Sequence, residues 1–287
     1  AKIYDGHQPG RVLMTLKGAR SRGVESYSMA CSEKELGISE DHEGIIFLDD
    51  DAPVGIPLAD YMGDAVLEIN LTPNIARDAN MLGVAREIAA LTGQKLRLPE
   101  GFYDYPTDGP AIQGRAAIQI TNPELNPRFV VGLIEGITIG DSPYWMQRRL
   151  KLAGMRPISN VVDVTNYVML EVGEPLHAFD YSVLQGRVNG GMPTILTRTA
   201  HPGERLTTLD GVERPLDDYS VLVCDTAGAL SIAGVMGGQE SEISERTTAI
   251  LLEGAAWNNI NIRRTVAAQK LQSEAAYRFS RGVHPAM

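Results

Sequence analysis

The sequence has few cysteines and none of the short motifs that mark the commonest enzyme classes. Its two cysteines, Cys31 and Cys224, are far apart and give no metal-ligand spacing, which indicates a reducing compartment, the cytoplasm. The five histidines are equally scattered, so the sequence predicts no metal site. A Walker loop, a GxSxG elbow, an HExxH pair and a dinucleotide-binding glycine motif are all missing. We therefore expect no ATP and no other cofactor on this chain.

Long hydrophobic runs are missing too. No run approaches the roughly 20 residues that span a bilayer, so we expect no membrane partner. The chain has no signal-peptide pattern and begins at Ala1 instead of a methionine, so we expect a fragment of a longer protein. A hydrophobic share of 44% with 22% charged residues is typical of globular proteins, and 287 residues can hold two domains.

The net charge of −10 comes from one segment. Residues 33–68 contain eleven acidic side chains against Lys34 alone, which accounts for the whole imbalance. The neutral remainder carries two basic runs, which are Arg148, Arg149, Lys151 and Arg156, and then Arg263, Arg264, Lys270, Arg278 and Arg281. Such runs are compatible with contacts to phosphates, but a solvated helix face gives the same pattern, and the residues leave both interpretations open.

Strand and helix patterns do not alternate regularly, which predicts an α+β fold. Strands are expected at 11–16, 44–48, 117–120, 129–139, 194–198, 221–224, 230–235 and 249–252. Helices are expected at 81–91, from Ser142-Pro143 to 153 with Ser142 as N-cap, at 260–271 and at 273–280. Leu209-Asp210-Gly211 is a hairpin turn signal. Residues 99–114 are rich in Pro, Gly and Asp and read as a linker.

The most informative stretch is 154–180, which predicts a turn, a short helix and a loop that carries His177. Ser159 or Asn160 can cap the helix, and Gly173 with Pro175 ends it. Thr165 and Asn166 interrupt a stripe that is otherwise apolar. A buried polar group without partners costs about 1–3 kcal/mol, so these two side chains need internal partners, water or a ligand.

Three further features could carry chemistry, and each has a structural alternative. The glycine-rich run 233–238 can expose backbone N–H groups to a ligand or be a simple strand-end turn. Glu253 follows an apolar run and could accept a hydrogen bond from a ligand hydroxyl or face water at a sheet edge. Residues 273–276 could line a cavity or be an ordinary helix start. His177 also has a structural alternative, because a lone histidine is more often structural than catalytic.

Several motifs together resemble one family, the β subunit of bacterial phenylalanyl-tRNA synthetase. They are the runs 154–180, Thr208–Arg214, Ala233–Gly238 and Tyr277–Pro285, together with Thr72-Pro73-Asn74 and Gly83–Glu87. Residues 17–37 are similar to the later half of the OB-fold tRNA-binding domain of that subunit. The resemblance implies four segments: a partial OB-fold domain (1–67), a helical connecting segment (68–98), a linker (99–114) and a B3/B4-type editing domain with a β-sandwich core (115–287).

The resemblance also implies an activity. The chain would belong to phenylalanine-tRNA ligase and would hydrolyse tyrosine wrongly attached to tRNA(Phe), without catalysing aminoacylation. Its partners would be tRNA(Phe) and the α subunit in an α2β2 assembly, and ATP and Mg²⁺ would bind outside this chain. The alternative is a non-catalytic module that contacts tRNA and supports the assembly. A separate pocket for hydrolysis, distinct from the pocket that selects phenylalanine for attachment, is physically reasonable. A pocket that fits phenylalanine rejects the added hydroxyl of tyrosine only weakly.

The family motifs assign two groups of site residues. The catalytic group, which would position the ester and the attacking water, is His177, Thr165 and Asn166. The substrate-binding group is Glu253, which would accept from the tyrosine hydroxyl, Gly234 and Gly237, which would approach by their backbone, and Ala275, which would keep the pocket roomy. No metal is implied, and the general base stays unassigned.

Overall fold

The computed structural model describes residues 2–48, 50–99, 109–189 and 191–286. Helices and strands are mixed without regular alternation, which confirms the predicted α+β class. The chain divides into two units by its internal contacts, Ala1–Leu67 and Glu68–Met287. Residues 100–108 of the expected linker lie outside the described residues.

The first unit contains two separate hairpins and two short helices. Strand β1 (Lys2–Tyr4) pairs with β2 (Leu13–Thr15), and β3 (Ala19–Ser21) pairs with β4 (Val24–Ser26). Helices α1 (Glu33–Leu36) and α2 (Leu58–Met62) follow. The strand expected at 44–48 is wrong. Phe47 is 82% exposed, and no strand pairs with this run among the described residues, so its apolar side chains have no sheet to bury them.

The second unit begins with a helical segment. A 3₁₀ helix, η1 (Pro73–Asp78), leads into α3 (Met81–Thr92). The Asn80 side chain caps α3 by accepting from the Gly83 N–H at 2.7 Å, and Gly93 ends it with a φ of +67°. These caps explain why the helix expected at 81–91 is found almost unchanged.

Two sheets form the body of the second unit. The five-stranded sheet has the order β13-β12-β11-β8-β5, where β5 and β8 are parallel and the other pairs are antiparallel. Its strands are β5 (Ala117–Ile120), β8 (Thr194–Thr199), β11 (Val221–Cys224), β12 (Ala229–Ile232) and β13 (Met236–Gly237). The antiparallel three-stranded sheet places β14 (Ala249–Ala256) between β6 (Arg128–Glu135) and β7 (Leu176–Asp180).

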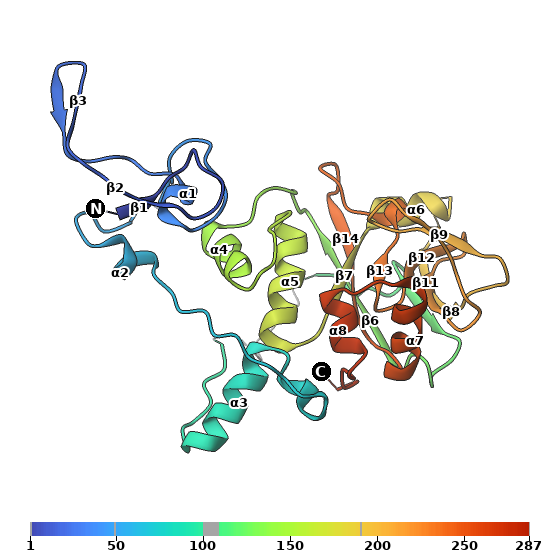
Figure 1. Cartoon of the computed structure of the whole chain (residues 1–287). Helices are drawn as coiled ribbons and strands as arrows, with labels where there is room; N and C mark the ends of the chain where they lie inside the picture. Colours follow the sequence, from blue (N-terminus) through green and yellow to red (C-terminus); the bar gives the residue numbers. More distant parts are fainter. Residues whose placement is uncertain (1, 49, 100–108, 190, 287) are drawn as a thin grey trace. The chain divides into compact units, whose positions relative to one another are not determined.

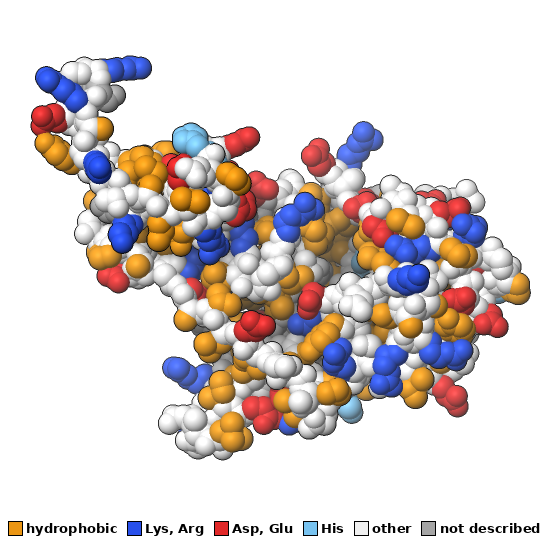
Figure 2. Space-filling model, viewed as in Figure 1, with side chains coloured by type: hydrophobic (Ala, Val, Ile, Leu, Met, Phe, Trp, Pro, Cys, Tyr) orange, Lys and Arg blue, Asp and Glu red, His pale blue; other side chains and the backbone are white. Residues whose placement is uncertain are grey.

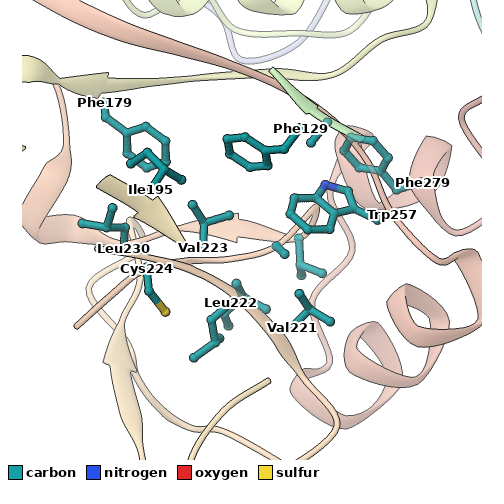
Figure 3. Packing of buried hydrophobic residues seen from close by; sticks show 14 of the residues in the cluster. Phe129, Phe179, Ile195, Val221, Leu222, Val223, Cys224, Leu230, Trp257 and Phe279 are labelled. Atoms are coloured by element: carbon teal, nitrogen blue, oxygen red, sulfur yellow. The ribbon is translucent and has the colours of Figure 1, made fainter. Parts of the chain in front are cut away.

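The hydrophobic core lies between the two sheets. Phe129 and Phe179 reach it from the three-stranded sheet, and Ile195, Val223 and Leu230 reach it from the five-stranded sheet (Figure 3). Two C-terminal helices, α7 (Asn259–Gln269) and α8 (Glu274–Phe279), add apolar side chains to the same cluster. The core is therefore the interior of a two-sheet sandwich.

The remaining elements lie around this sandwich. They are α4 (Tyr144–Leu152), α5 (Asn160–Val172), α6 (Tyr181–Arg187), a 3₁₀ helix η2 (Gln239–Ser241) and the hairpin β9 (Arg205–Thr207) and β10 (Glu213–Pro215). The turn expected at 209–211 joins the strands of this hairpin, and Gly211 adopts the left-handed φ of +75° that the turn requires.

The expected cap of α4 is wrong. Pro143 occupies the N-cap position, and the buried Ser142 hydroxyl instead donates to Asp163 Oδ2 of α5 at 2.6 Å. Asp163 Oδ1 accepts from the Ile158 N–H at 2.8 Å. One buried carboxylate therefore ties the start of α4 to the start of α5. The two helices lie side by side (Figure 1).

Candidate functional site

The three-stranded sheet brings His177 and Glu253 together. His177 of β7 is the direct partner of Glu253 in β14, and Phe179 is the partner of Leu251 in the same register. Side chains two residues apart share a face, and Leu251 and Phe179 are in the core, so His177 and Glu253 also point between the sheets. Directly opposed residues have Cβ atoms about 4.5–5.5 Å apart. The two side chains are neighbours on one face.

Both residues differ from their expected local structure. His177 lies in a strand and not in a loop, because residues 176–180 pair with the central strand β14. Glu253 lies in the middle of β14, which continues to Ala256, and is 7% exposed. The interpretation of Glu253 as a water-facing residue at a sheet edge is therefore wrong.

Burial changes the protonation of Glu253. The loss of solvent, followed by the nearby negative charge of Glu174, raises the pKa of Glu253 to about 8. Its Oε2 atom is shielded from solvent and has no hydrogen-bond partner among the described residues. At neutral pH this side chain is mostly an uncharged carboxyl group whose Oε2 atom has no hydrogen-bond partner among the described residues.

His177 is kept neutral by the same low-polarity surroundings. Burial lowers its pKa to about 4. The ring meets Phe179 edge to face, with centroids 4.6 Å apart. Its Nε2 atom is also shielded and has no partner in the part of the chain that the structure describes. Two unused polar atoms thus lie on neighbouring side chains, and buried polar groups usually have partners.

Gly237 joins this pair through its backbone. A Cβ atom at this position would lie 2.7 Å from Cε1 and 3.2 Å from Nε2 of His177, and 2.9 Å from Leu209 Cδ1. Any larger residue would push against the imidazole. The carbonyl of Gly237 accepts from the Leu209 N–H at 3.0 Å, which fixes the strand against the turn at 209–211.

Gly234 has a different role in the same glycine-rich run. Its φ is +66°, and a Cβ atom there would lie 2.9 Å from Trp257 and 3.0 Å from Phe279, both in the core. Its close neighbours are therefore core side chains and not His177 or Glu253. Ala275 packs on the same core, and Ser273 Oγ donates to the Val235 carbonyl at 2.9 Å, which ties α8 to this turn.

The expectation that this run exposes its N–H groups is wrong for three of them. The N–H groups of Ala233, Val235 and Gly238 donate to the carbonyls of Val221, Ile232 and Leu230. The run is mainly a strand-end turn that connects β12 and β13. Only the approach of Gly237 to the imidazole brings it to the His177–Glu253 pair.

Thr165 and Asn166 lie on α5, which packs against β7. The Thr165 hydroxyl donates to the Val162 carbonyl at 2.8 Å, so the helix itself supplies the partner that the sequence required. Asn166 is half-buried, and its side chain makes no hydrogen bond within the described ranges. Of the two, Asn166 is the one that still has polar atoms to offer a ligand.

A separate pocket of about 440 Å³ lies on the other face of the three-stranded sheet. Its lining includes Val130, Leu176 and Gly254, which alternate along their strands with the inward-facing residues. Glu174 lines this pocket, and burial raises its pKa to about 7 although its Oε1 accepts from the Ala255 N–H at 3.1 Å. Glu174 was not predicted from the sequence. The only sequence feature that marks it is its position next to Pro175, which ends the helix.

The described residues show neither a candidate metal site nor a helix that could span a membrane. The described residues contain no group of three His, Cys, Asp or Glu side chains that could hold a metal ion. No helix in the described ranges is long and apolar enough to cross a membrane. The two cysteines are unpaired thiols, and burial raises the pKa of Cys224 to about 12.

Comparison with known proteins agrees with the motifs. The chain is 47% identical over 284 residues to the phenylalanine–tRNA ligase beta subunit of Dehalococcoides mccartyi, which covers 99% of this chain and 34% of that subunit. It is 46% identical over 297 residues to the corresponding subunit of Moorella thermoacetica, with 97% and 36% covered. The chain thus spans about a third of the length of these relatives.

These similarities confirm the resemblance to the β subunit of phenylalanyl-tRNA synthetase that the sequence motifs indicated. A family model described as the B3/4 domain matches residues 125–287, more than half of the chain. The matched region contains both sheets except β5, and it contains every residue of the candidate site. The chain therefore belongs to the B3/4 domain family.

Proposed function

We propose that this chain is the part of a phenylalanine-tRNA ligase β subunit that hydrolyses tyrosine wrongly attached to tRNA(Phe). The observation that carries the proposal is the pairing of His177 with Glu253, each with a buried polar atom that has no hydrogen-bond partner among the described residues. The β-subunit relatives make a tRNA ester the natural substrate class. The partners would be tRNA(Phe) and the α subunit in an α2β2 assembly in the cytoplasm. ATP and Mg²⁺ would bind elsewhere in the assembly.

The polar pair suits a phenol and disfavours a phenyl ring. A tyrosine hydroxyl would donate to Glu253 Oε2 and so give this atom the partner it lacks. Phenylalanine would leave it unpaired, and an unsatisfied buried group costs about 1–3 kcal/mol. A site built to hydrogen-bond a substrate hydroxyl rejects the analogue that lacks it far more strongly than an apolar pocket can reject an added hydroxyl.

His177 would hydrogen-bond the attacking water molecule without taking a proton from it. An imidazole with a pKa of about 4 is a weak base at neutral pH, but its free Nε2 can hydrogen-bond a water molecule. Asn166 would orient the ester from α5 with its free amide, and Thr165 can still accept a hydrogen bond while it donates to the helix. Gly237 would leave room beside the imidazole, and Gly234 and Ala275 would shape the pocket through the core side chains that they contact.

The test is tyrosine release from Tyr-tRNA(Phe) by the complete synthetase. We expect Glu253→Ala and His177→Ala each to slow release by about ten-fold or more, because each removes a polar contact to the bound substrate. Glu245→Gln changes an exposed glutamate in the same domain and should leave the rate unchanged. Release at the wild-type rate by both site variants would refute the proposed site.

The alternative is a module that contacts tRNA and supports the assembly without hydrolysing the ester. It is supported by the glycine-rich run, where the N–H groups of Ala233, Val235 and Gly238 already donate to backbone carbonyls and are not offered to a ligand. The same experiment separates the two. A structural module predicts that the site variants change assembly or tRNA affinity and leave the rate of ester hydrolysis by the assembled enzyme unchanged.

A further inference from the structure

An aromatic and cationic cluster lies on the α4–α5 helix pair, outside the site described above. Trp145 lies in the first turn of α4 and is 48% exposed. The Arg149 guanidinium lies over its ring, 5.3 Å from the centroid, and donates to the Tyr167 hydroxyl of α5 at 2.6 Å. The rings of Trp145 and Tyr167 meet edge to face with centroids 5.5 Å apart. We call these three residues the Trp145 cluster.

Packing explains only part of this arrangement. The contacts of Arg149 and Tyr167 hold the indole of Trp145 in one orientation, yet about half of it stays in water. Trp257, the second tryptophan of the chain, is 3% exposed in the core. Arg149 has no ion pair among the described residues, so its charge is not neutralised by a neighbouring carboxylate. The cluster therefore offers a fixed flat ring beside an uncompensated cation.

This combination matches the chemistry of unpaired nucleic acid. Bases stack on exposed aromatic side chains while nearby cations contact the phosphates, and such stacking needs no particular base. Arg156 is exposed in the loop that joins α4 and α5, and it adds a positive charge to this pair of helices. Elsewhere on the second unit, basic and acidic side chains are interspersed on the face in view, so no broad field of one sign covers it (Figure 2). A local stacking contact fits this surface better than a wide electrostatic one.

One rigid element, α5, links the cluster to the candidate site. Tyr167 directly follows Thr165 and Asn166 on α5, so the three lie within about 3 Å along the helix axis. The same helix packs against β7, the strand of His177. A strand of RNA held at Trp145 would thus lie beside α5 at the level of the site residues.

We propose that the Trp145 cluster stacks an unpaired base close to the 3′ end of the tRNA, while Arg149 contacts the adjoining phosphate. This inference rests on the proposed function, because it takes the aminoacylated tRNA end as the substrate. The terminal adenosine carries the amino acid and must enter the site, so the stacked base is one that precedes it. Stacking there would hold the strand while the ester reaches His177 and Glu253.

The first test uses the whole 287-residue chain and a single-stranded ACCA RNA. Because Trp257 is buried, the change in tryptophan emission reports Trp145. We expect saturable quenching by the single strand and little by a duplex. With a labelled oligonucleotide, anisotropy should show affinity reduced about ten-fold in Trp145→Ala and largely kept in Trp145→Phe, which preserves a stacking ring. Arg149→Gln should weaken binding and reduce its salt dependence.

Matched controls come from the same unit. Ile260→Ala removes an exposed apolar side chain of α7, which is 60% exposed, and Arg246→Gln removes an exposed cation. Both should bind the RNA like the wild type. Circular dichroism and the melting temperature establish that each variant is folded, and Trp145→Phe keeps the test valid if Trp145→Ala is not. No saturable quenching in the wild type, or equal affinity of all variants, would overturn the proposal.

The second test separates this inference from the proposed function. In the complete synthetase, Trp145→Ala should raise the KM for Tyr-tRNA(Phe) about ten-fold and leave kcat near the wild-type value. If ester hydrolysis is intact and Trp145→Ala changes neither KM nor RNA affinity, this inference is wrong while editing stands. If site variants have no effect on hydrolysis but the RNA still quenches Trp145, the proposed function fails instead. Loss of subunit assembly with unchanged RNA affinity would mark a protein interface and overturn the inference.

Discussion

At the scale of single residues, the candidate site is defined by an acid that stays protonated and a histidine that stays neutral. Both shifts have burial as their first cause, and within the described part of the chain each group has one buried polar atom without a hydrogen-bond partner. Such groups weaken the folded state, because it must hold them in an unfavourable ionisation state. A site that carries this cost while empty regains part of it when a substrate supplies the missing hydrogen bonds.

The pH dependence of stability tests the state of Glu253. Its pKa rises from 4.5 to about 8 on folding, so between these values the folded chain keeps a proton that the unfolded chain has released. Stability must fall with rising pH in this window, by about 1.4 kcal/mol per pH unit from this group. Glu253→Gln removes the group, so its free energy of unfolding should exceed that of the wild type by a margin that grows from pH 5 to pH 8.

Urea unfolding of the chain at several pH values measures this margin. Groups whose titration does not depend on Glu253 cancel in the difference. Glu174 does not cancel, because its charge is coupled to Glu253 and its own pKa is about 7, so Glu174→Gln and the double variant complete the comparison. The lowered pKa of His177 makes the stability of both proteins rise with pH between about 4 and 6.5. Glu245→Gln, an exposed change, should show a margin near zero at every pH. A constant margin for Glu253→Gln would mean that Glu253 has an ordinary pKa, and the account of the site would fail.

The approach of Gly237 to His177 gives a second prediction. Gly237→Ala places a Cβ atom 2.7 Å from the imidazole, so the ring must move. We expect tyrosine release by the complete synthetase to fall about ten-fold, with a stability loss of about 1–3 kcal/mol from overpacking. Gly186→Ala in α6 is the matched control, since a Cβ there meets no atom within 4 Å. Full activity in Gly237→Ala would show that the imidazole position is not critical.

At the scale of elements, most of the longer helices and strands of the second unit could be predicted, and two of the exceptions lie at the site. Strands 117–120 and 221–224 have the expected bounds, because each is a short apolar run, broken only by Gln119 in the first of them. Strand β7 was missed and β14 was expected to end at residue 252. In both cases a polar residue, His177 or Glu253, occupies an inward position and breaks the apolar pattern. The polar side chains of the candidate site are therefore the reason why its strands were not predicted in full.

Pairing across the sheet could not be predicted from the sequence. The family motifs named His177 and Glu253, but only the register of β7 with β14 makes them neighbours. The role of Ser142 was also missed, because its partner Asp163 lies 21 residues away on another helix. Local patterns identify caps and turns, whereas contacts distant in sequence depend on the packing of whole elements.

The Asp163 contact predicts how α4 and α5 depend on each other. Asp163→Asn keeps the shape but removes one of the two acceptors that serve Ser142 and the Ile158 N–H. We expect a loss of about 1–2 kcal/mol in the free energy of unfolding, measured with urea. Asp141→Asn, an exposed change just before α4, should be neutral. If Asp163→Asn is as stable as the wild type, this buried contact does not hold the two helices together.

At the scale of the whole molecule, the chain is a B3/4 domain preceded by a small β-rich unit that carries most of the negative charge. The core lies entirely in the second unit, between residues 129 and 283. The proposed pocket belongs to that core, so its chemistry depends on the sandwich. The relatives are about three times as long as the chain, so the tests of the proposed function use the complete synthetase.

The most direct measurement is the ratio of hydrolysis rates for Tyr-tRNA(Phe) and Phe-tRNA(Phe) by the complete synthetase, in the wild type and in Glu253→Ala. Selection by the buried carboxyl predicts a large ratio in the wild type and a much smaller one in the variant, because alanine leaves the tyrosine hydroxyl without its acceptor. A ratio that stays the same in the variant would contradict recognition of the hydroxyl by Glu253.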